Sequence, residues 1–313
     1  MTLARSASSE AERSRAIGAG LCGLSAAGFA TLSVFGKIAL ASGLTLAGML
    51  SLRFAGAALV LGLGLWLTRR SPAGVSLGMM AGLLALGMFG YGVQSTLYFG
   101  GLQRVPASIS SLLLYVYPLF VAIYDRVLNH RPLPRLRQAA LGLALIGVAL
   151  TVRPDSSAGD SPLDPLGLAF VLGSAAWYAG YIIASDRVVR KVGAWASTTG
   201  ISLGAAVAFT VGGLATRSLD WRLNSDQAVL LVGIIIFSTI LPLSTFLAGV
   251  ARLGPTTASI VSALEPVFTV ALAALILGES LRPVQAAGGA LVLAAAVLVQ
   301  WPEKRSGQWP VAT

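Results

Sequence analysis

One carboxylate, Glu265, lies deep inside a long apolar stretch of this chain, at about residues 255–277. In a helix it would be roughly ten residues, or ~15 Å, from either end. An isolated charge is costly in hydrocarbon, so such a group faces a cavity, pairs with a partner or stays protonated. Glu265 could therefore exchange a proton or bind a substrate ammonium group. The alternative is a neutral acid that only hydrogen-bonds two helices together.

Two prolines, Pro118 and Pro266, occupy the middle of corresponding apolar stretches. Each proline removes a backbone donor and frees the carbonyl four residues earlier, which is that of Leu114 or Ser262. We expect a kink that shapes a cavity or acts as a hinge. A static kink of the kind that membrane helices tolerate is the alternative.

Aromatic and polar residues mark further candidates in other apolar stretches. Trp177 and Tyr181 are one helical turn apart, so they can share a face that holds an apolar or aromatic substrate side chain. An aromatic belt at the bilayer boundary is the alternative, although both residues lie deep. Pro242 and its neighbouring hydroxyls should loosen another helix, either to contact substrate or to cap freed carbonyls. The predicted substrate-binding residues are Glu265, Trp177, Tyr181, Tyr91, Gln94 and Ser244.

Other kinds of chemistry are disfavoured. The chain has one cysteine, Cys22, and one histidine, His130, so an intrachain disulfide and a His-x-x-x-His metal pair are excluded. A single histidine in a charged loop does not favour a Ser-His-Asp hydrolase. We therefore expect that the protein binds no metal or cofactor and is not an enzyme. Lys37 and Arg53, near helix ends, are expected to extend toward the membrane surface or, less often, to recognise substrate charge.

The composition is that of a protein embedded in a membrane. Hydrophobic residues make up 56% of the 313 residues, and charged residues only 11%, against about 25% charged residues in a soluble domain. Ten apolar stretches can be read, and no strand-like alternation is present. The stretches cover approximately residues 16–40, 46–67, 77–101, 106–128, 136–152, 165–185, 194–215, 226–250, 255–277 and 284–301.

The net charge of +10 is explained by orientation in the membrane and not by binding to nucleic acid. With the N-terminus in the cytoplasm, 15 of the 22 Lys and Arg residues fall in cytoplasmic segments. This asymmetry predicts a multi-pass protein of a bacterial-type inner membrane with both termini in the cytoplasm.

The chain also repeats itself, with a first unit at 1–152 and a second at 153–313. Arg104, Ser111 and Pro118 match Arg252, Ser259 and Pro266 at an offset of 148 residues, and Gln138 matches Gln285 at 147. Five spans are an odd number, so the two units should insert in opposite orientations. The predicted fold is an all-α membrane protein with ten transmembrane helices in two inverted five-helix repeats, an architecture common in secondary transporters.

The sequence resembles the EamA-type drug/metabolite transporter superfamily. The resemblance rests on the segments Leu264-Glu265-Pro266-Val267-Phe268 and Leu277-Gly278-Glu279-Ser280-Leu281, followed by Gln285. The first half carries a weaker copy, in which Asn129-His130-Arg131 replaces the Gly-Glu segment. The whole chain is most similar to the YddG-type amino-acid exporters. The resemblance also implies that the first four helices of each half surround the pathway, with the fifth and tenth outside.

We therefore expect a transporter that exports small metabolites by alternating access, with aromatic or neutral amino acids as substrates. An importer or exchanger of another metabolite or drug is the alternative, and a receptor or scaffold without flux is less favoured. The expected partners are an amino-acid-like small molecule, the lipid bilayer and, in one possible arrangement, further copies of the chain.

Overall fold

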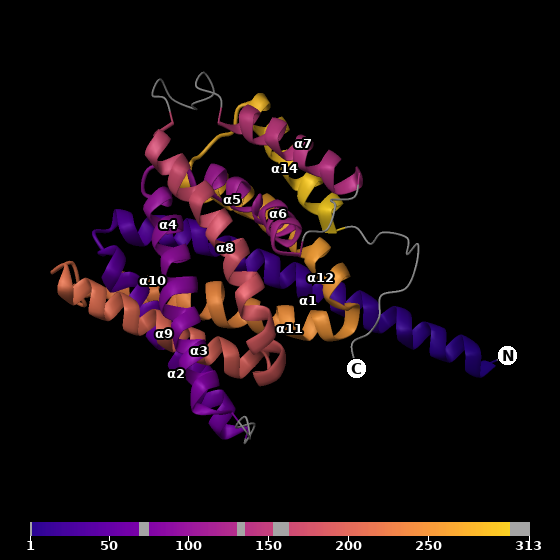
Figure 1. The fold of residues 1–313 in the computed structure, drawn as a ribbon, viewed down its shortest axis with the longest axis horizontal. Helices are drawn as coiled ribbons and strands as arrows, with labels where there is room; N and C mark the ends of the chain where they lie inside the picture. Colours follow the sequence, from indigo (N-terminus) through magenta and orange to yellow (C-terminus); the bar gives the residue numbers. More distant parts are fainter. Residues whose placement is uncertain (1, 69–74, 130–134, 153–162, 301–313) are drawn as a thin grey trace.

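The computed structural model describes residues 2–68, 75–129, 135–152 and 163–300. The described part of the chain is helical, and its helices pack into one bundle from which the start of α1 projects (Figure 1). His130 and the link 153–162 between the two predicted repeats lie outside the described residues. The first half contains α1 (Thr2–Ala41), α2 (Leu46–Leu67), α3 (Leu77–Ala85), the π-helical segment η1 (Leu86–Tyr91), α4 (Gly92–Leu102), α5 (Ala107–Leu114), α6 (Tyr117–Asn129) and α7 (Arg135–Thr151).

The second half follows the same order of elements. It contains α8 (Pro165–Val192), α9 (Ala194–Ala215), α10 (Ser225–Ile235), the π-helical segment η3 (Ile236–Ile240), α11 (Leu241–Leu253), α12 (Pro255–Ser262), α13 (Glu265–Leu277) and α14 (Pro283–Gln300). Among the described residues, nine helical segments are long and apolar enough to cross a membrane. The predicted fifth span, α7, is shorter than these nine, with 17 residues.

Local signals in the sequence set several helix starts. The Thr45 hydroxyl accepts a hydrogen bond from the Gly48 amide at the start of α2. Asp164 accepts from the Leu166 and Gly167 amides at the start of α8, directly before Pro165. Such caps satisfy amides that have no partner inside the helix, and proline at the first position costs no hydrogen bond.

The two prolines predicted to kink their helices lie next to complete breaks. The fourth span is divided into α5 and α6 by a turn at residues 115–116, and the ninth into α12 and α13 by a turn at residues 263–264. Each break lies two to three residues before Pro118 or Pro266, where the missing amide weakens the helical ladder. The prediction of a disturbed helix is confirmed at both positions.

The third and eighth spans each contain a π-helical segment, η1 and η3. In η3 the Thr239 hydroxyl donates to the Ile234 carbonyl at 3.1 Å. Just beyond it, the Ser244 hydroxyl donates to the Ile240 carbonyl at 2.7 Å. This segment agrees with the helix loosening predicted around Pro242.

The halves pack against each other in a reciprocal way. Helix α1 packs along α11 and α13, which belong to the eighth and ninth spans, while α8 packs along α4 and α6 of the third and fourth. Helices α2 and α9 form another pair. Each half therefore places its first helix against the third and fourth spans of the other. The inversion of the halves relative to a membrane stays a prediction.

The fifth and tenth spans, α7 and α14, form a tightly packed pair of their own (Figure 1). A side chain added at Gly147 would lie 2.8 Å from the Gly288 carbonyl oxygen, and one added at Gly288 would lie 2.7 Å from that of Gly147. Only glycine allows such an approach of two backbones, which is a common basis of helix association in membranes.

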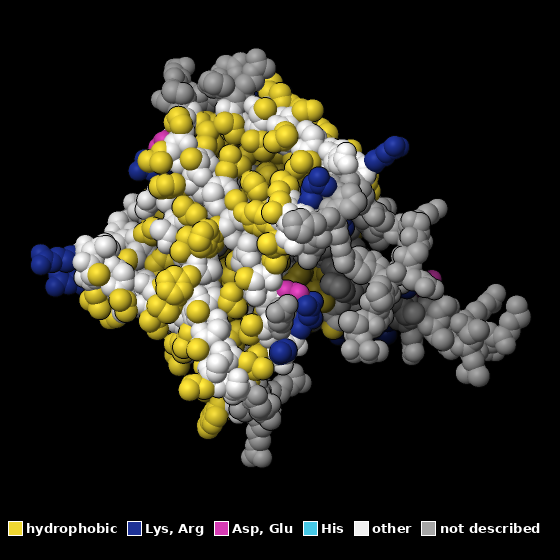
Figure 2. Space-filling view, in the orientation of Figure 1, with side chains coloured by type: hydrophobic (Ala, Val, Ile, Leu, Met, Phe, Trp, Pro, Cys, Tyr) yellow, Lys and Arg dark blue, Asp and Glu magenta, His cyan; other side chains and the backbone are white. Residues whose placement is uncertain are grey.

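The outside of the bundle is largely apolar. Large hydrophobic side chains that are more than half exposed include Leu59, Phe89, Val211, Val229 and Leu275. Figure 2 shows hydrophobic side chains over much of one face, with the visible Lys and Arg side chains toward its left edge and its right-hand part. Apolar side chains on this scale suit contact with lipid and not with water.

Candidate functional site

Glu265 lies at the first position of α13, directly after the break in the ninth span. Its carboxyl oxygen Oε2 is 2.9 Å from the hydroxyl of Tyr115, which belongs to the turn that breaks the fourth span. The same hydroxyl is 2.7 Å from the carbonyl oxygen of Ser262. This carbonyl is the one freed by Pro266, so the two broken spans meet through one tyrosine.

The Tyr115 hydroxyl has one hydrogen and two neighbouring acceptors. When it donates to the Ser262 carbonyl, a protonated Glu265 can donate to the tyrosine oxygen, and two full hydrogen bonds form. When Glu265 is ionised, its oxygen and the Ser262 carbonyl compete for the single hydrogen. Protonation of Glu265 therefore changes the contact between the two broken spans.

A row of aromatic rings, here called the aromatic row, runs from Tyr115 across the bundle to α2. Neighbouring ring centroids along it are 5.0 to 5.9 Å apart, the range of favourable aromatic contacts. The row draws on α2, η1, α8 and the fourth span. In order, its members are Phe54, Tyr91, Tyr181, Tyr178, Tyr117 and Tyr115.

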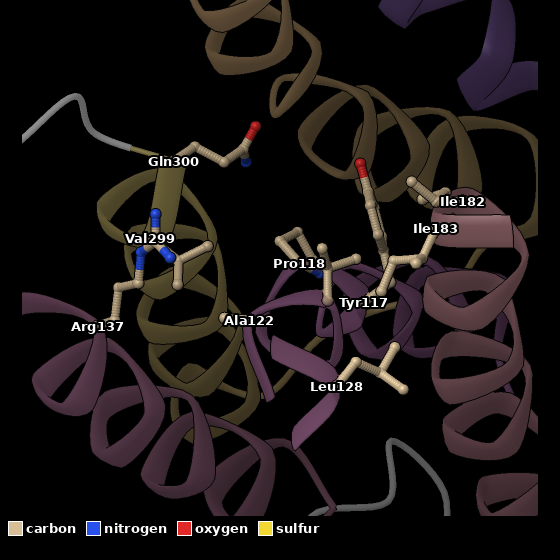
Figure 3. Close-up of a pocket in the computed structure, with 10 residues that line it drawn as sticks. Tyr117, Pro118, Ala122, Leu128, Arg137, Ile182, Ile183, Val299 and Gln300 are labelled. Atoms are coloured by element: carbon tan, nitrogen blue, oxygen red, sulfur yellow. The ribbon is translucent and has the colours of Figure 1, made fainter. Parts of the chain in front are cut away.

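A pocket of about 460 Å³ borders the aromatic row at Tyr117. Its lining comes from α6, α7, α8 and α14, and it includes Pro118 beside the break in the fourth span (Figure 3). Figure 3 shows the Tyr117 hydroxyl and the Gln300 amide extending to the same side of the open space, with Arg137 beyond Val299. A pocket of this size, mostly apolar with a few polar groups, can hold an amino acid.

The fifth and tenth spans also line this pocket, through Arg137 of α7 and Gln300 of α14. Their place outside the pathway stays a prediction. Both residues lie at ends of their helices. The two short spans therefore contribute to the mouth of the pocket while their middles pack on each other.

Trp177 and Tyr181 both line a further pocket of about 610 Å³ between η1, α6 and α8, but their other contacts differ. Tyr181 belongs to the aromatic row. Trp177 is 46% exposed, and its indole N–H donates to the carbonyls of Phe89 and Gly90, both at 3.0 Å. These carbonyls belong to η1, so Trp177 stabilises the π-helical segment from the outside of the bundle.

The other predicted contacts have partners within the bundle. Tyr91 is a member of the aromatic row, between Phe54 and Tyr181. Gln94 is buried between α4 and α8, where its amide donates to the Ser174 hydroxyl at 3.1 Å. The Ser244 hydroxyl donates a hydrogen bond to the Ile240 carbonyl, four residues earlier in the same span. These contacts favour a packing role for Gln94 and a capping role for Ser244.

At the opposite end of the fourth span, Glu279 joins the two halves. Its carboxylate accepts hydrogen bonds from the amides of Ala107 and Ser108, at 2.8 and 3.0 Å, and from the Ser108 hydroxyl at 2.8 Å. Lys37 of α1 donates to the same carboxylate at 3.1 Å and to the Val105 carbonyl at 2.9 Å. We call this cluster the Glu279 clamp.

The electrostatics of the clamp favour the ionised carboxylate. Burial by itself would raise the pKa of Glu279, but the Ser108 and Ala107 amides, the Lys37 ammonium group and the Ser108 hydroxyl outweigh it. Together they hold the pKa of this carboxyl group below its ordinary value. The clamp is therefore fully formed at neutral pH.

Tyr115, Tyr117 and Tyr178 belong to the aromatic clusters of the fourth and sixth apolar stretches, but they are not among the predicted substrate-binding residues. One signal for Tyr117 was present, because the repeat offset of 148 residues pairs Tyr117-Pro118 with Glu265-Pro266. No comparable signal identifies Tyr115, since its contact with Glu265 depends on how the halves pack.

The whole architecture is shared with known proteins. The EamA-like transporter family matches the chain twice, at residues 16–153 and 165–301. The boundary between these matches falls within a few residues of the predicted boundary between the repeats.

Two relatives illustrate the similarity. The uncharacterized transporter YcbK of Bacillus subtilis is 27% identical over 227 residues, which cover 69% of this chain and 71% of the relative. The threonine/homoserine exporter RhtA of Escherichia coli strain K12 is 26% identical over 206 residues, which cover 66% of each protein. The chain thus matches about two thirds of the length of these relatives.

A solved crystal structure has the same fold. It superposes with a TM-score of 0.58 at 20% sequence identity, and the match covers 88% of this chain and 95% of the other.

Proposed function

We propose that this chain, which belongs to the EamA-like transporter family, exports amino acids across a bacterial-type inner membrane by alternating access. The substrates are small neutral or aromatic amino acids. The single observation that carries this proposal is the meeting of two broken spans at Glu265 and Tyr115, beside a pocket of amino-acid size.

The position of this contact supports a transport site. Inverted-repeat transporters place their substrate sites near the membrane midplane, where broken helices expose backbone groups. Here the Ser262 carbonyl is such a group, and Glu265 supplies a carboxyl group that can bind an α-ammonium group or carry a proton. The similarity to a threonine/homoserine exporter supports amino acids as the substrate class.

The closed and open ends of the bundle support alternating access. The Glu279 clamp ties α1, α5 and the end of α13 together at one end. The pocket beside Tyr117 lies toward the other end, where α6 finishes and α7 begins. In the topology that the Lys and Arg residues favour, the clamp faces the outside and the pocket faces the cytoplasm, as an exporter ready to receive substrate requires.

Efflux from whole cells tests the direction of transport. Cells that express the chain would be loaded with threonine or phenylalanine from dipeptides, and the amino acid released into the medium would be measured. We expect faster release than from cells that express equal amounts of the Glu265→Gln variant. Equal release by the two, with both proteins folded in the membrane, would contradict export through this site.

A further inference from the structure

Arg53 is a buried cation in the interior of the bundle. It is the eighth residue of α2, about 10 Å along the helix axis from the first residue, and it is only 2% exposed. Its Nε donates to the Thr239 hydroxyl of η3 at 3.2 Å. Its guanidinium carbon lies 4.9 Å from the ring centroid of Phe54 and 5.9 Å from that of Phe99.

The partners of Arg53 in this structure do not neutralise its charge. Among the described residues, no carboxylate lies within 4 Å of its guanidinium group. Lys37 and Arg104, which lie nearer to helix ends, have Glu279 and Asp164 as partners at 3.1 and 3.0 Å. A buried arginine without a counter-ion is costly, and in membranes such residues mark ligand or ion pathways.

The surroundings of Arg53 connect it to Glu265. The guanidinium group interacts electrostatically with two tyrosine hydroxyls, those of Tyr91 and Tyr98, and is also hydrogen-bonded to Tyr91. Tyr91 belongs to the aromatic row. The row begins at Phe54, under the guanidinium group, and ends at Tyr115, which is hydrogen-bonded to Glu265. A cationic group and a carboxyl group therefore stand at the two ends of one row of rings.

We propose that Arg53 binds the carboxylate of the transported amino acid at a second position along the pathway, at the other end of the aromatic row from Glu265. This inference rests on the proposed function. The planar guanidinium group can bind a carboxylate through two parallel hydrogen bonds. Contacts with ring faces and with the hydroxyls of Thr239 and Tyr91 are weaker, so an arriving carboxylate replaces them at low cost. Arg53 is covered in this structure and becomes accessible as the rings around it separate.

The test compares an amino acid with its primary amide, which keeps the ammonium group and loses the negative charge. Purified protein in liposomes would exchange labelled threonine, and unlabelled threonine or threoninamide would compete. For the wild type we expect threonine to compete at least about tenfold better than the amide, because a charge-assisted hydrogen bond is worth that much. For Arg53→Gln we expect this preference to fall toward one, through weaker competition by threonine.

Two further variants complete the test: a replacement for Arg53→Gln and a matched control. Arg53→Met keeps an unbranched apolar stem and buries no polar group, so it replaces Arg53→Gln if that protein does not fold. Arg104→Gln is the matched control, because it removes an arginine that pairs with Asp164 at the surface. We expect Arg104→Gln to keep the wild-type preference for the acid.

The outcomes separate this inference from the proposed function. If the wild type exchanges threonine and both Arg53 variants keep the full preference for the acid over the amide, the assignment of Arg53 is wrong and the proposed function stands. If the folded wild type exchanges no amino acid at all, the proposed function and the inference fail together.

Discussion

At the level of single side chains, the contact between Glu265 and Tyr115 links the two halves of the molecule. The Tyr115 hydroxyl also holds the Ser262 carbonyl, so the proton on Glu265 and the break in the ninth span are connected through three atoms. This arrangement is the basis of the role in transport that we propose for Glu265.

Replacement of Glu265 by Gln tests this role. Glutamine keeps the shape and an acceptor for Tyr115, so we expect a folded protein with an unchanged melting temperature. It cannot ionise, so we expect exchange of amino acids to fall at least about tenfold or to lose its dependence on pH between 5 and 8. The exposed Glu12→Gln variant is the control. Wild-type exchange at every pH in Glu265→Gln would leave Glu265 as a packing residue.

We expect Trp177 and Tyr181 to have different roles. Trp177 should stabilise the fold, and Tyr181 should contact the substrate. Trp177→Phe loses the hydrogen bonds to Phe89 and Gly90, worth about 1 kcal/mol in a membrane, so its melting temperature should fall while exchange continues. Tyr181→Ala opens the aromatic row and should slow exchange of phenylalanine more than that of threonine. Measurements of thermal unfolding and of exchange check both effects. Equal loss for both substrates in Tyr181→Ala, together with lower stability, would favour a packing role.

At the level of elements, the breaks in the fourth and ninth spans are the candidate hinges. In Pro266→Ala the restored amide can donate to the Ser262 carbonyl and displace the Tyr115 hydroxyl. We expect this variant and Pro118→Ala to straighten their spans and to change the exchange rate. The change in conformation should appear in the distance between spin labels on the exposed Val127 and Leu275.

The control for the hinges is Pro165→Ala, because Pro165 is the first residue of α8 and blocks no helical hydrogen bond. We expect it to behave as the wild type. If Pro118→Ala and Pro266→Ala also keep wild-type rates and distances, the breaks are static.

The Glu279 clamp should hold one end of the pathway closed. Since its carboxyl pKa is lowered in the folded protein, the stability that it contributes is present above the pKa of the unfolded chain and is lost only as the pH falls through the lower folded value. We therefore expect the clamp to persist between pH 5 and 8, and Glu279→Gln to weaken it across that whole range.

Accessibility of the residues behind the clamp measures this effect. Ile109 lines a small pocket beside Glu279 and is 2% exposed, so Ile109→Cys in a Cys22→Ala background reports opening. We expect Glu279→Gln to speed its reaction with an impermeant thiol reagent several-fold. Asp164→Asn, which keeps the helix cap and loses the Arg104 bridge, should leave the rate unchanged. The same rate in Glu279→Gln would show that the clamp does not control access.

The sequence predicts some elements and misses others for physical reasons. Proline and hydroxyl groups are local signals, so the breaks near Pro118 and Pro266 and the loosened helix around Pro242 could be predicted. The segment η1 has no proline, and its path depends on close packing. A side chain at Gly87 would collide with the Ile201 carbonyl of α9, and one at Gly90 would lie 2.6 Å from the Tyr181 ring.

At the level of the whole molecule, composition and the internal repeat predicted the all-α membrane fold, and the matches to the EamA-like family confirm it. The candidate site was predictable only in part. Glu265 stands out because it is a carboxylate in an apolar stretch, whereas its partner Tyr115 and the Thr239 partner of Arg53 each come from the opposite half of the chain. Those two contacts arise from packing between halves, which no local pattern in the sequence encodes.

Counterflow in liposomes tests whether this chain carries amino acids across a membrane. Purified protein would be placed in liposomes loaded with an excess of unlabelled threonine, phenylalanine or another amino acid, and a trace of the labelled compound would be added outside. We expect transient accumulation of label inside, at a rate that Glu265→Gln reduces. If the folded protein accumulates no amino acid, it is not an amino-acid transporter.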